Sequence, residues 1–247
     1  MTYPLFLAEP GSLDAAIVGS TQVLEGDEGR HAATVKRLRA GERLLVGDGT
    51  GRQLTGTVLA ADGAELSYRV DAVSDEPAAT PRFTLVQALA KSDRDEAAVE
   101  AATEYGIDRV IPWQAERSIV VWRGDRAEKS RQKWCSVVRA AAKQSRRAWV
   151  PEVEPILDTA ALAARIPQVC VAYVLHEDAP TPLAGRPVPG AGEVMVIVGP
   201  EGGISPDELT TLTAAGAVPV RLGRQVLRSS SAGPAAIAVL SAADRWL

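Results

Sequence analysis

The chain has 247 residues, a net charge of −4 at pH 7, 46% hydrophobic residues and 23% charged residues. This balance is typical of a soluble globular protein and provides ample apolar material for a core. No basic start followed by an apolar run indicates a signal peptide, and no apolar stretch approaches the length of a membrane span. We therefore expect a cytoplasmic protein without membrane contact. The two cysteines and two histidines are scattered, so no metal site is expected.

The first 73 residues have the pattern of a small β-barrel. Residues 44–62, LLVGDGTGRQLTGTVLAAD, predict a hairpin with a glycine-rich turn, and Leu66–Val73 predicts a further strand. Between the early strands, Arg30–Ala40 predicts a short basic helix with Val35 and Leu38 facing the core. The polar segment 74–81, SDEPAATP, then reads as a linker.

From residue 82 to 247, predicted strands alternate with predicted helices, which indicates a mostly parallel sheet covered by helices on both faces. The expected strands are Arg82–Ala88, Arg109–Trp113 and Gln168–Leu175. One expected helix starts at Asp93 or Asp95 and runs to Tyr105, and a long amphipathic helix covers Asp125–Arg147. The chain is therefore predicted to have an α+β fold with two domains.

Two strand–loop–helix units near the end of the chain carry the strongest signal. In the first unit, Val194–Val198 is an apolar strand, glycines follow at 199, 202 and 203, and Ser205 starts a helix with a capping box. In the second unit, Ala217–Leu222 is a strand, Gly223 starts the loop, and the last helix begins near residue 230 or 231. We expect these two strands to be neighbours, so that their loops form a pocket at the carboxyl ends of a parallel sheet.

Two basic segments stand out in this acidic chain. Residues 123–147 hold nine basic side chains against two acidic ones, and residues 30–43 hold five against one. A localised site for a polyanion such as RNA is one interpretation, and solvated helix faces are the other. Motifs for a Walker-type nucleotide site, a dinucleotide-binding Rossmann fold and a nucleophile elbow are absent from the sequence.

Five segments closely resemble the motifs of the RsmE family, in the order of that family, from residue 31 to the C-terminus. The two glycine-loop units carry the resemblance in VIVGPEGGISPDEL and LGRQVLRSSSAGPAAIAVL. Upstream, the matching segments are HAATVKRLRAGERLLVGD, DEAAVEAATEYGIDRVIPWQAERS and WCSVVRAAAKQSRRAWVP. RsmE proteins are methyltransferases of the SPOUT class that methylate N3 of a uridine in 16S ribosomal RNA.

The resemblance implies a fold, a cofactor and partners. The fold is an N-terminal PUA-like β-barrel plus a C-terminal SPOUT α/β domain, in which the last helix threads a loop to form a deep trefoil knot within about residues 170 to 245. The cofactor is S-adenosylmethionine, and the substrate is 16S rRNA within a small ribosomal subunit. The protein is expected to be a homodimer with each active site near the subunit boundary.

The resemblance also implies site residues. For the cofactor these are Leu175, His176, Gly199, Pro200, Glu201, Gly202, Leu222, Gly223, Val226 and Leu227, of which the leucines and Val226 would wall the adenine. Arg228 is the candidate catalytic residue, because a cation there could stabilise the uracil anion; its alternative roles are to hold an RNA phosphate or to cap a carboxylate. The candidate RNA-binding residues are His31, Lys36, Arg37, Arg39, Lys143, Arg146 and Arg147.

Several alternatives remain open. Each leucine could simply belong to the core, and His31 and His176 could be plain surface histidines. The family commonly has glutamates where this chain has Lys143 and Ser230, so neither position can supply a carboxylate base. A SPOUT enzyme acting on another RNA, such as a transfer RNA, and a non-catalytic RNA-binding assembly factor are the alternative functions.

Overall fold

The computed structural model describes residues 3–246 and divides into two compact units. The first unit comprises Met1–Ala78 together with Ala142–Val150, and the second comprises Ala79–Ala141 together with Pro151–Leu247. The end of the long helix α3 (Asp125–Ser145) is therefore assigned to the first unit. The contiguous domain limits given by the sequence, 1–73 and 82–247, stay a prediction.

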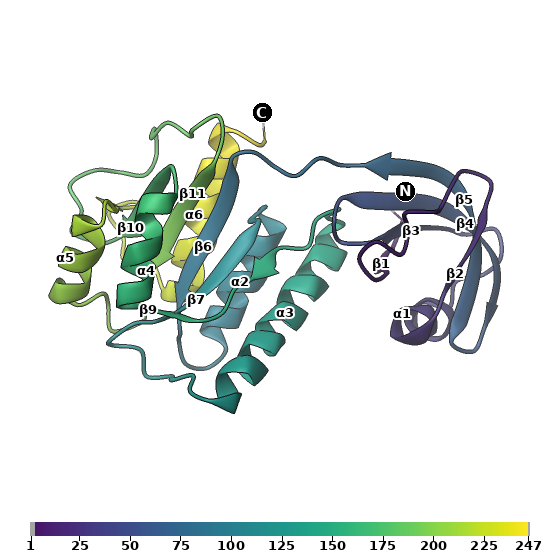
Figure 1. Ribbon diagram of the computed structural model, residues 1–247, viewed down its shortest axis with the longest axis horizontal. Helices are drawn as coiled ribbons and strands as arrows, with labels where there is room; N and C mark the ends of the chain where they lie inside the picture. Colours follow the sequence, from purple (N-terminus) through teal and green to yellow (C-terminus); the bar gives the residue numbers. More distant parts are fainter. Residues whose placement is uncertain (1–2, 247) are drawn as a thin grey trace. The chain divides into compact units, whose positions relative to one another are not determined.

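The first unit is a curled five-stranded sheet (Figure 1). Its strand order is β1-β3-β4-β5-β2, in which only the β1–β3 pair is parallel. The strands are β1 (Leu5–Leu7), β2 (Thr21–Leu24), β3 (Arg43–Gly47), β4 (Arg52–Asp62) and β5 (Glu65–Asp75). The predicted hairpin is confirmed as β3 and β4. Alternate residues of these strands point inward, and Phe6, Leu44 and Tyr68 are among the fully buried side chains of the core.

The prediction of a basic helix over Arg30–Ala40 is wrong on two points: the bounds of the helix and the burial of Val35. The helix α1 runs over Gly26–Arg30, a π-helical turn follows over His31–Val35, and Arg37 adopts a left-handed conformation with φ of 54°. This break ends the helical repeat, and Val35 consequently remains 65% exposed, whereas Leu38 does pack against the core.

The second unit is a mostly parallel α/β layer structure. Its sheet has the order β12-β10-β11-β6-β7-β8, with β9 also paired to β7, and each of these pairs is parallel. The strands are β6 (Arg82–Ala88), β7 (Arg109–Gln114), β8 (Glu152–Val153), β9 (Leu157–Asp158), β10 (Val171–Leu175), β11 (Glu193–Val198) and β12 (Val218–Val220).

Helices cover both faces of this sheet, as predicted (Figure 1). Besides α3, they are α2 (Arg94–Glu104), α4 (Thr159–Arg165), α5 (Pro206–Ala214) and α6 (Ser229–Ala243). Helices α2 and α6 pack against each other and against β6, while α4 and α5 pack together, and Leu162 and Leu212 reach the core beneath them.

The prediction that the two strands before the glycine loops are neighbours in the sheet is wrong. The strands that precede the two glycine loops, β11 and β12, are not neighbours, because β10 lies between them. The pairing order depends on contacts between distant segments, which local sequence patterns do not encode. The threading of the last helix that the resemblance implies stays a prediction.

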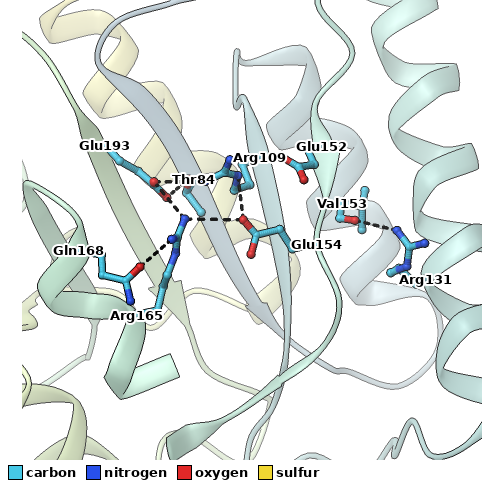
Figure 2. Close-up of polar contacts among 9 residues, drawn as sticks. All are labelled: Thr84, Arg109, Arg131, Glu152, Val153, Glu154, Arg165, Gln168 and Glu193. Carbon is cyan, nitrogen blue, oxygen red and sulfur yellow. Dashed lines mark hydrogen bonds and ion pairs between the residues drawn. The ribbon is translucent and has the colours of Figure 1, made fainter. Parts of the chain in front are cut away.

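Ionic contacts join elements at the amino ends of the central strands (Figure 2). Arg109 at the start of β7 lies 2.9 Å from a Glu154 oxygen and 3.3 Å from a Glu193 oxygen. Arg165, at the end of α4, lies 3.4 Å from the same Glu193 carboxylate, and the Thr84 hydroxyl donates to it at 2.6 Å. These contacts tie β6, β7, β11 and α4 together at this end of the sheet.

Neither a membrane helix nor a metal site is found in the part of the chain that the structure describes. Over residues 3–246, no helix has the length and apolar character needed to cross a membrane. The same residues contain no group of three or more His, Cys, Asp or Glu side chains that could hold a metal ion.

Candidate active site

A cavity of about 650 Å³ opens at the carboxyl ends of β10, β11 and β12. Three loops contribute to it: residues 175–178 after β10, residues 198–206 after β11, and residues 220–229 after β12. Because β10 lies between the other two strands, all three loops meet at one edge of the sheet.

All the residues suggested for the cofactor line this cavity. They are Leu175, His176, Gly199, Pro200, Glu201, Gly202, Leu222, Gly223, Val226 and Leu227. Arg228 lines it as well. The sequence thus identified residues that the fold brings together, although their individual roles stay predictions.

The loop after β11, which contains Gly199, Gly202 and Gly203, is called the first glycine loop. Two arginines that the sequence analysis did not select hold it in place. Arg94, on the first turn of α2, donates to the Glu201 carboxylate at 3.1 Å, and the backbone N–H of Lys91 donates to the same oxygen at 3.3 Å. Arg117 donates to the Gly202 carbonyl at 3.1 Å. Glu201 therefore joins its loop to the start of α2.

Gly202 also has a structural role that the sequence did not suggest. A Cβ on Gly202 would lie 3.2 Å from the Arg117 Cβ, so the absence of a side chain allows the 115–118 segment to approach this loop. Its neighbour Gly203 has φ of +74°, a conformation that side chains disfavour. Gly202 thus lines the cavity and also has Arg117 as a protein neighbour.

A hydrogen-bond network centred on the buried Ser205 and Glu208 continues from this loop into α5. The predicted capping box is confirmed, because Ser205 accepts from the Glu208 backbone N–H and Glu208 accepts from the Ser205 N–H. Glu116 extends it: its carboxylate accepts from the Ser205 hydroxyl at 2.6 Å, and its backbone N–H donates to Glu208 at 2.8 Å. The Thr159 hydroxyl at the start of α4 donates to the same Glu208 oxygen at 2.8 Å.

The loop after β12 is the most exposed wall of the cavity. Val226 is 76% exposed and Leu227 is 40% exposed, although both are apolar. Arg228 is the N-cap residue of α6 and is exposed, so its guanidinium stands at the cavity wall. The last helix starts at Ser229, one or two residues earlier than expected.

The candidate RNA-binding residues all fall in the first unit, whereas the residues that line the cavity belong to the second. Lys36, Arg37 and Arg39 are exposed on the turn after the π-helical segment. Lys143 is different, because its ammonium forms an ion pair with Glu28 at 2.6 Å and only 19% of its side chain is exposed.

The three remaining candidates of this set are His31, Arg146 and Arg147. His31 packs edge-on against Phe6, and burial, followed by the charge of Lys143, lowers the pKa of its imidazole. The lowered pKa favours the uncharged form of His31. Arg146 is exposed, with φ of 59°, whereas Arg147 is half-buried.

A signal for the missed arginines was available in the sequence. Arg117 belongs to the segment Glu116–Ser118, which the family resemblance already included, but no role was attached to it. Arg94 lies just before the first residue of the same matching segment. Their contacts with the glycine loop join positions 85 to 107 residues apart, and only the fold reveals such pairs.

Comparisons with known proteins identify the family. The RNA methyltransferase domain matches residues 77–241, and the RNA methyltransferase PUA domain matches residues 24–66. The chain is 46% identical to the ribosomal RNA small subunit methyltransferase E of Mycobacterium bovis, over 92% of this chain and 89% of that protein.

The chain belongs to the RsmE family. The RsmE protein of Bacillus subtilis is 26% identical over 88% of each chain. Among solved structures, that of the RsmE protein of Neisseria gonorrhoeae, bound to S-adenosyl methionine, matches with a TM-score of 0.86 and 27% identity over 98% of each chain. Membership in the RsmE family explains both the PUA-type first unit and the α/β second unit.

Proposed function

We propose that the protein transfers a methyl group from S-adenosylmethionine to N3 of a uridine in small-subunit ribosomal RNA. The observation that carries this proposal is the cavity at the carboxyl ends of β10, β11 and β12, which gathers the RsmE-type glycine loops and Arg228 in one place. The name of the 46% identical relative and the cofactor in the gonococcal structure agree with it.

The residues of the cavity fit S-adenosylmethionine. An adenine needs apolar cover, and Val226 and Leu227 are apolar side chains that the protein itself leaves exposed at the cavity wall. The backbone of the loops after β10, β11 and β12 offers donors and acceptors for the polar edge of the base and the ribose. We assign the apolar wall to Leu175, Leu222, Val226 and Leu227.

The chemistry divides between the cofactor and the chain. S-adenosylmethionine, when bound, supplies an electrophilic methyl group on a sulfonium sulfur. Uridine N3 must lose its proton to act as the nucleophile, and the exposed guanidinium of Arg228 is suited to stabilise the resulting uracil anion. The chain's further contribution is to align the two reactants, which lowers the entropic cost of the reaction.

The first unit contributes contacts with the RNA backbone in this proposal. Lys36, Arg37 and Arg39 are exposed and positively charged, as a phosphate-binding surface requires. Lys143 is already neutralised by Glu28, so we leave it out of this surface. We further propose that the protein acts in the cytoplasm, as a homodimer, on rRNA within the small subunit.

The proposal is tested by mapping methylated nucleosides in small-subunit rRNA from a strain that lacks this gene. We expect one 3-methyluridine to disappear and to return when the wild-type gene is restored. A complete 3-methyluridine complement in the deletion strain, or loss of a modification in transfer RNA alone, would overturn the assignment. Restoration of growth by a variant that cannot bind S-adenosylmethionine would instead favour an assembly factor.

A further inference from the structure

The loop that follows β7, residues 115–118, forms the back wall of the first glycine loop. Arg117 donates to the Gly202 carbonyl at 3.1 Å, and its Cβ would stand 3.2 Å from a Cβ on Gly202. The glycine loop thus contacts both the cavity and this segment, of which Arg117 also lines the cavity. Its shape depends on what the segment contacts.

Glu116 is the anchor of this segment. Its carboxylate accepts a 2.6 Å hydrogen bond from the hydroxyl of Ser205, which is 3% exposed, and its backbone N–H donates to Glu208, which is 5% exposed. Bonds of this kind that involve an ionised acceptor are among the stronger ones in proteins. Ser205 begins α5 directly after the glycine loop, so these bonds fix the point at which the loop ends.

Glu116 does not itself line the cavity, whereas Arg117 does. A change at Arg117 could affect a ligand through direct contact. An effect of Glu116 on ligand binding must instead pass through Ser205 and the glycine loop. A substitution of Glu116 therefore tests the positioning of the loop without removing a side chain that contacts the ligand.

We propose that Glu116 is a positioning residue that holds the glycine loop, through Ser205, in the conformation that binds the cofactor. This inference rests on the proposed function, because it takes S-adenosylmethionine as the ligand of the cavity. The physical reason is that Glu116→Ala would leave the buried Ser205 hydroxyl without its acceptor and release one end of the loop. Ordering a mobile loop on binding would then weaken affinity.

The experiment measures the affinity of the full-length protein for S-adenosylhomocysteine by calorimetry, together with the melting temperature. Glu116→Ala should weaken binding by about tenfold, the order expected from losing a hydrogen bond to a charged group. Glu116→Gln keeps an oxygen acceptor for Ser205 and should bind within about threefold of the wild type. Glu100→Ala is the matched control, because Glu100 is exposed on α2 and its side chain forms no hydrogen bond or ion pair among the described residues; its affinity should be unchanged.

The affinity is measured at a temperature well below the melting temperature, where the variant is folded. This measurement distinguishes a positioning role of Glu116 from a purely structural one. A purely structural role would lower the melting temperature of Glu116→Ala and leave the affinity of the folded protein unchanged, which would overturn the inference. In turnover assays, the positioning role predicts a raised KM for S-adenosylmethionine with kcat largely retained. If Glu116→Ala does not fold, Glu116→Asp serves instead, because the shorter side chain withdraws the carboxylate from Ser205.

The two proposals fail in different ways. If the wild type does not bind S-adenosylhomocysteine, the proposed function fails and the inference fails with it. If the wild type binds and Glu116→Ala binds within twofold of it, only the positioning role is overturned.

Discussion

Neighbouring glycines in the loop after β11 should tolerate alanine to different degrees and for different reasons. In Gly202→Ala, the new Cβ would lie 3.5 Å from the Arg117 carbonyl oxygen, an ordinary contact, but only 3.2 Å from the Arg117 Cβ, so Arg117 would have to shift by a few tenths of an ångström. Overpacking of this kind costs about 1–3 kcal/mol. The cost should lower stability, or displace the loop and weaken cofactor binding.

In Gly203→Ala, the expected loss of stability comes from the backbone conformation. The φ of +74° costs a non-glycine residue about 1–2 kcal/mol, whereas the nearest Arg117 atom to a Cβ would be 3.9 Å away. Gly190→Ala is the matched control, because no atom lies within 4 Å of its Cβ position and its φ is ordinary. Its change in unfolding free energy should stay within about 0.5 kcal/mol.

Thermal unfolding and calorimetry with S-adenosylhomocysteine measure both effects. For a chain of this size, each kcal/mol should lower the melting temperature by roughly 2–4 °C. Gly202→Val adds two further methyl groups against Arg117 and should abolish detectable cofactor binding. The reasoning is refuted if Gly202→Ala matches Gly190→Ala in both melting temperature and affinity.

Three more predictions concern other parts of the molecule. Arg228→Ala should lower turnover greatly with little change in melting temperature, and the deficit should shrink as pH rises and the uridine ionises unaided; wild-type turnover at neutral pH would contradict this role. Replacing Lys36, Arg37 and Arg39 together with glutamine should flatten the salt dependence of RNA binding by up to about three ions, without changing cofactor affinity; an unchanged slope would mean that these side chains are only solvated. Burial raises the pKa of Tyr68 from 10.0 to about 12. Because the folded state disfavours the phenolate, stability should be complete below pH 10 and fall by up to about 2–3 kcal/mol between pH 10 and 12, and chemical denaturation of Tyr68→Phe should lack this component.

The sequence predicted elements whose signals are local. The apolar run Val194–Val198 and the capping box at Ser205 both appear in the structure, because burial on both faces and N-capping depend on adjacent residues. The family resemblance then selected the residues that meet at the cavity.

Features that depend on distant contacts could not be predicted. Val35 has the spacing of an inward-facing helical residue, but the chain leaves the helix near Arg37 and the side chain stays in solvent. Lys143 reads as a free cation in the sequence, yet Glu28, 115 residues away, neutralises it. Likewise, the need for glycine at 202 arises from Arg117, 85 residues earlier.

The central claim is that the cavity formed by the three loops supports methylation of uridine N3 in small-subunit rRNA. Its most direct test combines purified protein, S-adenosylmethionine with a labelled methyl group, and small ribosomal subunits from a strain that lacks this gene. Nucleoside mass analysis should find one labelled 3-methyluridine per subunit with the wild-type protein, and a greatly reduced rate with Arg228→Ala. Label on a different base, or no label in rRNA although S-adenosylmethionine binds, would contradict the account.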